Sequence, residues 1–215
     1  IEGLNIAAYV ERNDPRDVFI SIKYKNLEEL KKGSIIGSSS RRRELQLKLI
    51  NPNILILNIR GNIDTRIKKL QEGELDAIIL AASGVKSLNL DNKIRQFFNT
   101  QEMIPAAGQG VIAVQCRNNN IEIKNILQNI NNNETMYCAI AEKEMLRAIG
   151  GDCDTAVGSF ATLEKDTIRL RAQLFSDDGK KSFDYEELGN KSDYIKIGKK
   201  VGEKILKLAG KSFKK

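Results

Sequence analysis

The feature that most constrains the fold is the apolar run at 76–81, where a single aspartate is followed by Ala-Ile-Ile-Leu-Ala. A run without polar alternation is typical of a strand that is covered on both faces. Short apolar runs and helical spacings alternate before it, at 33–37, 41–50, 54–57 and 64–71. This β-α-β-α-β order predicts an α/β unit with a mostly parallel sheet.

The sequence on either side of this unit predicts two further parts. Residues 1–10 and 111–115 both read as strands, and they could pair in a second sheet that flanks an inserted domain. Helical patterns at 134–149 and 193–208 surround three alternating segments that are joined by turn residues. These patterns predict a small C-terminal α+β domain of three antiparallel strands with helices.

Composition restricts the classes of function. The chain has 215 residues and a formal net charge of +7, which favours anionic partners such as a small polycarboxylate, a phosphate or nucleic acid. It has no histidine, which removes the commonest general base, and its three cysteines form no CxxC pair. We therefore expect no metal site and a reduced, cytoplasmic setting. No run is apolar for long enough to span a bilayer, no secretion signal is visible, and Ile1 begins mid-pattern, so we expect natural sequence before it.

One thiol lies in a glycine-rich stretch. Residues 150–158, Gly-Gly-Asp-Cys-Asp-Thr-Ala-Val-Gly, place Cys153 directly after a predicted helix. Glycine gives the backbone access to positive φ and leaves room for a bulky group, so a thiol here could carry a covalent group. The stretch also fits an ordinary helix C-cap with a cysteine that takes no part in function. Cys116 and Cys138, in a strand and a helix, are most simply small buried residues.

Two basic clusters lie at predicted strand-to-helix turns, at 37–43 (Gly-Ser-Ser-Ser-Arg-Arg-Arg) and at 60–66 (Arg-Gly-Asn-Ile-Asp-Thr-Arg). Free N–H groups at a helix start attract anions, whereas an arginine in the first turn has the wrong sign for the helix dipole. The arginines therefore indicate that an anion is expected there. Because ligands bind at the carboxyl ends of strands in open α/β sheets, both clusters would face one cleft. The planar fork of arginine suits carboxylates.

Other interpretations of these motifs remain open. The first cluster could be a solvated helix start or a nucleic-acid patch, although no aromatic residue is interleaved for stacking on bases. Gln109, between Gly108 and Gly110, could contact a ligand or simply belong to a tight turn at a hinge.

The chain resembles porphobilinogen deaminase (hydroxymethylbilane synthase) at these motifs and at several others. The matching motifs keep the family's order and spacing from the first residue to the C-terminal helix, and they lie at 39–43, 60–66, 70–81, 105–110, 141–143 and 150–153. The resemblance implies an α/β lobe like those of periplasmic binding proteins, followed by the small C-terminal domain.

The resemblance also implies a specific activity. Family members join four porphobilinogen molecules head to tail with release of ammonia, and then free the linear tetrapyrrole with water. The chain grows on a dipyrromethane cofactor, which is bound by a thioether to one cysteine, and Cys153 occupies that place. Further residues match positions that contact the carboxylate groups of cofactor or substrate, or lie beside them: Ser39, Arg42, Arg43, Arg60, Asn62, Arg66 and Gln109.

Three domains follow from the resemblance. Residues 1–10 and 105–131 would be remnants of the family's first domain, 11–104 the second, and 132–215 the domain of cofactor attachment. The family's catalytic aspartate belongs to a segment upstream of residue 1, so we assign no catalytic residue here and expect this piece to be inactive alone. The parent protein is expected to be a cytoplasmic monomer that binds porphobilinogen and linear polypyrrole, with no nucleic acid or membrane partner.

Two positions depart from the family pattern. Ser87 stands where many members carry an arginine, and 154–157 reads Asp-Thr-Ala-Val in place of a small-residue run that ends in proline. One carboxylate contact would therefore be missing or replaced.

Two rival functions can be distinguished from this one. A solute-binding module with two α/β lobes predicts a reversible anionic ligand and an unmodified Cys153. A nucleic-acid-binding protein predicts binding to unrelated DNA with a steep dependence on salt.

Overall fold

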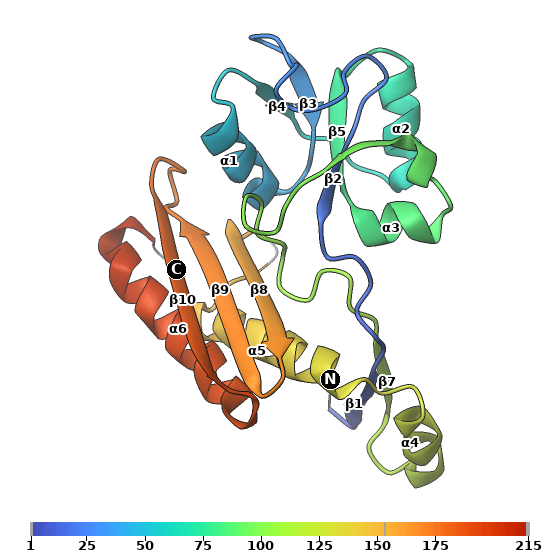
Figure 1. Ribbon diagram of the computed structural model, residues 1–215, viewed down its shortest axis with the longest axis vertical. Helices are drawn as coiled ribbons and strands as arrows, with labels where there is room; N and C mark the ends of the chain where they lie inside the picture. Colours follow the sequence, from blue (N-terminus) through green and yellow to red (C-terminus); the bar gives the residue numbers. More distant parts are fainter. Residues whose placement is uncertain (1, 153, 214–215) are drawn as a thin grey trace.

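The computed structural model describes residues 2–152 and 154–213, and three sheets organise this part of the chain (Figure 1). A two-stranded sheet pairs β1 (Leu4–Tyr9) with β7 (Ala113–Arg117), antiparallel, which confirms the predicted pairing of the first strand with a later one. The helix α4 (Ile121–Gln128) lies beside these strands at the lower edge of Figure 1.

The central sheet has the strand order β4-β3-β5-β2-β6. Its strands, in chain order, are β2 (Asp17–Ile20), β3 (Ile35–Gly37), β4 (Leu55–Leu57), β5 (Ala77–Ala81) and β6 (Ile94–Phe97). Its helices are α1 (Arg41–Ile50), α2 (Ile63–Gln71) and α3 (Ala82–Ser87), followed by the 3₁₀ turn η1 (Asp91–Lys93).

The fold is the expected α/β lobe, and its sheet is mixed. Strand β3 is parallel to both β4 and β5, whereas β2 is antiparallel to β5 and β6. The parallel part coincides with the helical crossovers α1 and α2. No helix separates β2 from β3, and β2 enters the sheet in the opposite direction.

Strand β5 explains why its sequence is apolar without alternation. Ile78 and Leu80 belong to the hydrophobic core on one face of the sheet, and Ala77 and Ile79 belong to the core on the other face. All four side chains are buried, so the prediction of a strand covered on both sides is confirmed.

The C-terminal domain has the predicted architecture. Strands β8 (Val157–Glu164), β9 (Thr167–Phe175) and β10 (Ser182–Asn190) form an antiparallel sheet in the order β10-β9-β8. The helices α5 (Asn133–Ile149) and α6 (Tyr194–Ala209) pack together on one face of this sheet, as Figure 1 shows. The 3₁₀ turns η2 (Lys191–Asp193) and η3 (Gly210–Ser212) flank α6.

A buried ion pair joins the segments that lead in and out of the central lobe. Arg12 Nη1 donates to Glu142 Oε1 at 2.6 Å, and the Glu142 side chain is wholly buried. The same carboxylate accepts from the backbone N–H groups of Gly108 at 2.6 Å and Ala161 at 2.7 Å. One carboxylate therefore connects the incoming segment, the returning segment and strand β8 to helix α5.

The two structurally described cysteines differ in burial. Cys138 is buried, as predicted, and burial raises the pKa of its thiol to about 12, so it stays protonated. Cys116 is only half-buried, because its sheet has two strands and one covering helix, and the prediction that it is a buried residue was wrong. Within the described ranges, no helix is both long enough and apolar enough to cross a membrane.

The contact between α5 and α6 depends on a glycine. A Cβ atom built on Gly202 would lie 2.8 Å from the carbonyl oxygen of Met145 and 2.5 Å from Cβ of Ala148. We expect Gly202→Val to force the helices apart and to lower the free energy of unfolding by about 2 kcal/mol. Urea denaturation measures this, with the exposed Lys199→Ala on the same helix as the control. Equal stability of the two variants would contradict this account of the packing.

Candidate ligand-binding site

The two basic clusters meet at the carboxyl ends of β3 and β4, as expected. Ser40 caps α1 by accepting from the backbone N–H of Arg43 at 3.4 Å, and Asn62 caps α2 by accepting from that of Thr65 at 2.9 Å. Arg66 Nη2 donates to Ser39 Oγ at 3.4 Å, and this contact bridges the two turns. The helix starts that carry the clusters therefore lie side by side.

Arg42 and Arg43 do not both point toward solvent, because they share a buried carboxylate. Arg42 Nη1 lies 2.8 Å from Asp17 Oδ2, and Arg43 Nη2 lies 2.8 Å from Asp17 Oδ1. Asp17 is 0% exposed and the Arg42 side chain 4%. The positive charge of these arginines is unfavourable at the start of α1 because of the helix dipole. That charge is compensated by a carboxylate of the chain itself.

Gln109 closes this cluster. Its Nε2 donates to Asp17 Oδ1 at 3.0 Å and to the carbonyl oxygen of Pro15 at 2.6 Å, while its Oε1 accepts from Arg42 Nη2 at 3.3 Å. The turn that carries Gln109 needs glycine, since Gly108 and Gly110 both have positive φ. Gln109 therefore both belongs to a tight turn and contacts Arg42 in the structure.

The electrostatics of the cluster leave a surplus of positive charge. Burial raises the pKa of Asp17, but the charges and hydrogen bonds of Arg42 and Arg43 outweigh burial and hold that pKa below its ordinary value. One ionised carboxylate between two guanidinium groups leaves a net charge of +1. Partial burial, and then repulsion by Arg43, lowers the pKa of the Arg66 guanidinium, which shows that the surplus reaches the second turn.

Two arginines of the second cluster have no carboxylate partner in the described parts of the chain. Arg60 is exposed, and Arg66 donates its Nε to the carbonyl oxygen of Gly61 at 2.9 Å. The side-chain oxygen of Asn62 accepts from Thr65, and its NH₂ group makes no hydrogen bond within the described part of the chain. These cations are available to an anion from solution.

Cys153 lies outside the described residues, and its neighbours form a tight turn. Asp152 Oδ1 accepts from the backbone N–H groups of Asp154 and Thr155, each at 3.0 Å, and from Thr155 Oγ1 at 2.9 Å. The turn follows α5, which ends at Gly150 in the left-handed conformation. The departure from the family pattern at 154–157 thus contains the second half of this turn.

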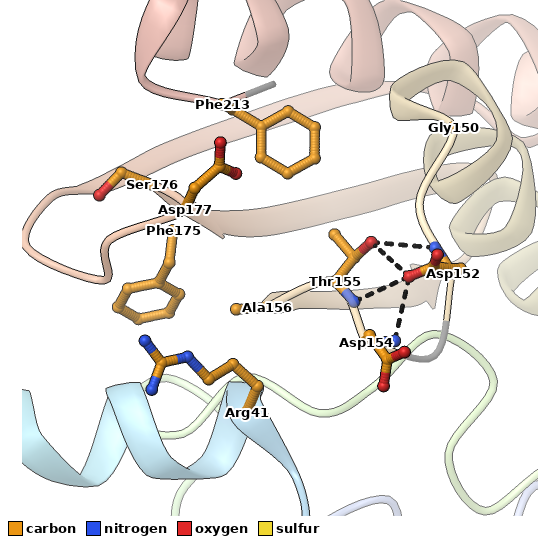
Figure 2. Close-up of a pocket in the computed structure, with 10 residues that line it drawn as sticks. All are labelled: Arg41, Gly150, Asp152, Asp154, Thr155, Ala156, Phe175, Ser176, Asp177 and Phe213. Carbon is orange, nitrogen blue, oxygen red and sulfur yellow. Dashed lines mark hydrogen bonds between the residues drawn. The ribbon is translucent and has the colours of Figure 1, made fainter. Parts of the chain in front are cut away.

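Two pockets adjoin this turn. The larger, of about 380 Å³, is shown in Figure 2, where Phe213 lies near the top, Phe175 lies above Arg41 at the left and the Asp152–Thr155 contacts lie at the right. Its remaining lining includes three carboxylates, which would repel an anion: Asp152, Asp154 and Asp177.

The smaller pocket, of about 250 Å³, has a more positive lining. Arg42 and Lys143 supply two positive charges and Asp152 one negative charge, whereas Leu146 and Val157 supply apolar surface. Within the described residues, the buried Nε of Arg42 has no hydrogen-bond partner. The Arg42 side chain therefore lines this pocket while one of its buried donors stays unpaired.

Two residues of this site were not predicted as such. Asp17 was not considered in the sequence analysis, although its place directly before the apolar run Val18–Ile20 is a signal that it is buried. Lys143 belonged to a matching motif without an assigned role. Ser87, where many members of the family carry an arginine, donates its hydroxyl to the carbonyl oxygen of Ser83 at 2.8 Å in its own helix.

Fold and site together define a class of protein: an α/β lobe with a cationic edge, joined to a small α+β domain that presents a glycine-bordered turn beside a pocket. Comparison with family models identifies which member of that class it is. The chain belongs to the porphobilinogen deaminase family, since residues 1–125 match the model described as "Porphobilinogen deaminase, dipyromethane cofactor binding domain" and residues 136–207 match "Porphobilinogen deaminase, C-terminal domain".

Solved structures with some similarity include a methionine-binding protein and a lipoprotein. The methionine-binding protein MetQ is 13% identical, with a TM-score of 0.43 over 62% of this chain and 63% of that one. A YaeC-family lipoprotein from Enterococcus faecalis V583 is 12% identical, with a TM-score of 0.41 over 66% and 68%. The chain therefore spans less than two thirds of the length of MetQ, and these matches carry no argument about function.

The buried carboxylate predicts a dependence of stability on pH. Because the pKa of Asp17 is depressed, its stabilisation is present above about pH 4 and is lost as the pH falls through the folded-state pKa. We expect Asp17→Asn to lower the free energy of unfolding by about 3 kcal/mol at pH 7, with a smaller gap from wild type at pH 3. Urea denaturation at both pH values measures the gap, and a gap of the same size at each would show that the charge of Asp17 does not stabilise the fold.

Proposed function

We propose that this chain is part of a hydroxymethylbilane synthase, which joins four porphobilinogen molecules into a linear tetrapyrrole on a dipyrromethane cofactor. The observation that carries the proposal is the pocket lined by Arg42 and Lys143 beside the Asp152–Thr155 turn, in a chain of this family. Porphobilinogen carries acetate and propionate groups, so a growing polypyrrole is densely anionic. The surplus charge around Arg42 and Arg43 suits such a ligand.

The residues of the smaller pocket fit a pyrrole with carboxylate groups. The guanidinium group of Arg42 and the ammonium group of Lys143 would receive a carboxylate, and Leu146 would contact the ring. Arg60 and Arg66 would hold carboxylates farther along the chain of pyrroles, together with the amide of Asn62 and the hydroxyl of Ser39. Gln109 would act on the ligand indirectly, by fixing the position of Arg42. Arg43 would act on the ligand through its positive charge.

Cys153 is the proposed point of covalent attachment. When bound, the cofactor supplies the free pyrrole position on which new units are added. The chain's own residues bind and orient the carboxylate groups, which brings successive units into one geometry. Of the carboxylates near the pocket, Asp17 is engaged by two guanidinium groups and Asp152 by its own turn. Neither is free to stabilise the cations that form as ammonia leaves, and we propose that a residue outside this chain does so and that the isolated chain does not turn over.

The three sheets suggest how the parent protein is divided. We propose that 1–10 and 105–131 belong to one domain, 11–104 to a second and 132–215 to a third. The partners would be porphobilinogen and linear polypyrrole, in the cytoplasm, with the parent protein as a monomer.

A second function is favoured by one observation. The five-stranded lobe with unpaired Arg60 and Arg66 would also serve a small-anion-binding module without catalysis. Such a module predicts a reversible ligand and a Cys153 that carries nothing.

The mass of the chain distinguishes these two functions. We expect the intact mass to exceed the sequence mass by two linked pyrroles when the chain is produced together with the rest of its enzyme, and peptide mapping to place them on Cys153. Cys153→Ser should lack the added mass, whereas Cys138→Ser should keep it because the protonated, buried thiol of Cys138 is unreactive. An unmodified wild-type chain from the active enzyme would exclude the proposed attachment.

Ligand binding tests the second basic cluster. We expect Arg66→Ala to weaken binding of porphobilinogen about tenfold, because it removes a half-buried guanidinium group that has no internal carboxylate. Titration calorimetry measures the dissociation constant. Lys68→Ala on the same helix removes the same charge from an exposed side chain and should leave the constant unchanged. Equal effects of the two substitutions would indicate only a general electrostatic attraction.

A further inference from the structure

Asp17 is a buried carboxylate that neither the sequence motifs nor the family assignment accounts for. It is the first residue of β2, and its side chain is wholly enclosed. An ionised carboxylate is costly to bury unless cations and hydrogen bonds compensate it. Asp17 has both, and every group that compensates it is also a proposed ligand contact or the neighbour of one.

The contacts of Arg42 show what Asp17 controls. Arg42 Nη1 is held between Asp17 Oδ2 at 2.8 Å and the carbonyl oxygen of Ile104 at 2.7 Å. Nη2 donates to Gln109 Oε1 at 3.3 Å. The guanidinium plane is thereby fixed from one side, and Nε is left without a partner.

Arg43 is fixed by the same carboxylate. Its Nε lies 2.9 Å and its Nη2 2.8 Å from Asp17 Oδ1, and its Nη1 donates to the carbonyl oxygen of Ile79 at 3.4 Å. The two guanidinium groups repel each other, since Arg43 contributes to lowering the pKa of Arg42. Asp17 therefore holds two like charges close together that would otherwise separate.

We propose that Asp17 is a positioning residue of the ligand site: it clamps Arg42 and Arg43 so that Arg42 stays in the lining of the smaller pocket, where a pyrrole carboxylate would bind. The inference rests on the proposed function, and it deepens it by assigning the specificity of the pocket. By neutralising one of the two charges, Asp17 also leaves the cluster of Asp17, Arg42 and Arg43 with a net charge of +1.

A neighbouring carboxylate offers a matched control. Asp14 is also shared by two cations, Arg16 at 2.7 Å and Lys86 at 2.8 Å, in the same incoming segment. Hydrogen bonding to Arg16 lowers the pKa of Asp14 despite partial burial. Neither cation lines the smaller pocket or contacts Arg42 or Arg43 in the described structure. Asp14→Asn therefore removes a shared carboxylate without releasing the proposed ligand arginines.

The experiment compares Asp17→Asn, Asp17→Glu and Asp14→Asn with wild type in the whole chain, below the unfolding temperature of each variant. Two quantities are measured. The first is the ratio of dissociation constants for porphobilinogen and for the same pyrrole with its carboxyl groups replaced by methyl groups. The second is the set of ¹H–¹⁵N signals of the arginine guanidinium groups, in which a clamped guanidinium gives separate, slowly exchanging signals.

We expect Asp17→Asn to lower the preference for the carboxylated pyrrole about tenfold and to abolish the slowly exchanging signals of Arg42 and Arg43, because the clamp is lost. Asp17→Glu keeps the charge and should restore part of both, and it replaces Asp17→Asn if that variant does not fold. Asp14→Asn should resemble wild type. A purely structural role would weaken the binding of both pyrroles equally.

A folded Asp17→Asn variant that keeps the wild-type preference would overturn the inference and leave the proposed function intact. If wild type binds neither pyrrole, the proposed function fails, and Asp17 with its arginines is an ion pair of the fold only. The two failures are therefore distinguishable.

Discussion

The arrangement of the molecule depends on one carboxylate at the junction of its three sheets. Glu142, in the middle of α5, receives Arg12 from the incoming segment, the N–H of Gly108 from the returning segment and the N–H of Ala161 from β8. A buried carboxylate with several charge-assisted hydrogen bonds is strongly directional, and the loss of any partner leaves the others with an uncompensated charge. The three parts of the chain are thus held by an interaction that tolerates little change in geometry.

Charge is distributed in two layers around the ligand site. In the inner layer, Asp17 pairs with Arg42 and Arg43 at 2.8 Å, so one of their two positive charges is neutralised inside the fold. In the outer layer, Arg60 and Arg66 have no internal carboxylate within the described ranges. The arginines at the two helix starts therefore differ: some pair with a carboxylate of the fold, and others have no such partner in the described part of the chain. The sequence alone does not separate these two cases.

The sequence predicted the elements with strong periodicity. Helix α1 has the predicted bounds, 41–50, because helical spacing dominates locally. The direction of β2 could not be predicted in this way, since it depends on the path of the chain between sheets. The burial of Arg42 depends on Asp17, which lies 25 positions earlier in the sequence, and no local pattern contains that pairing. Long-range electrostatic pairs of this kind require the fold to be known first.

Helix α5 connects Glu142 rigidly to the turn that follows the helix. Glu142 lies in its middle, and the helix ends at Ile149 just before the turn of Asp152 and Thr155. A helix rises 1.5 Å per residue, so about 12 Å separates the junction from the turn. The close packing at Gly202 stiffens that length against α6. Any rotation of the C-terminal domain relative to the central lobe about this junction would therefore displace the turn, and the position of the group that we propose is attached there would change with the angle between the two parts.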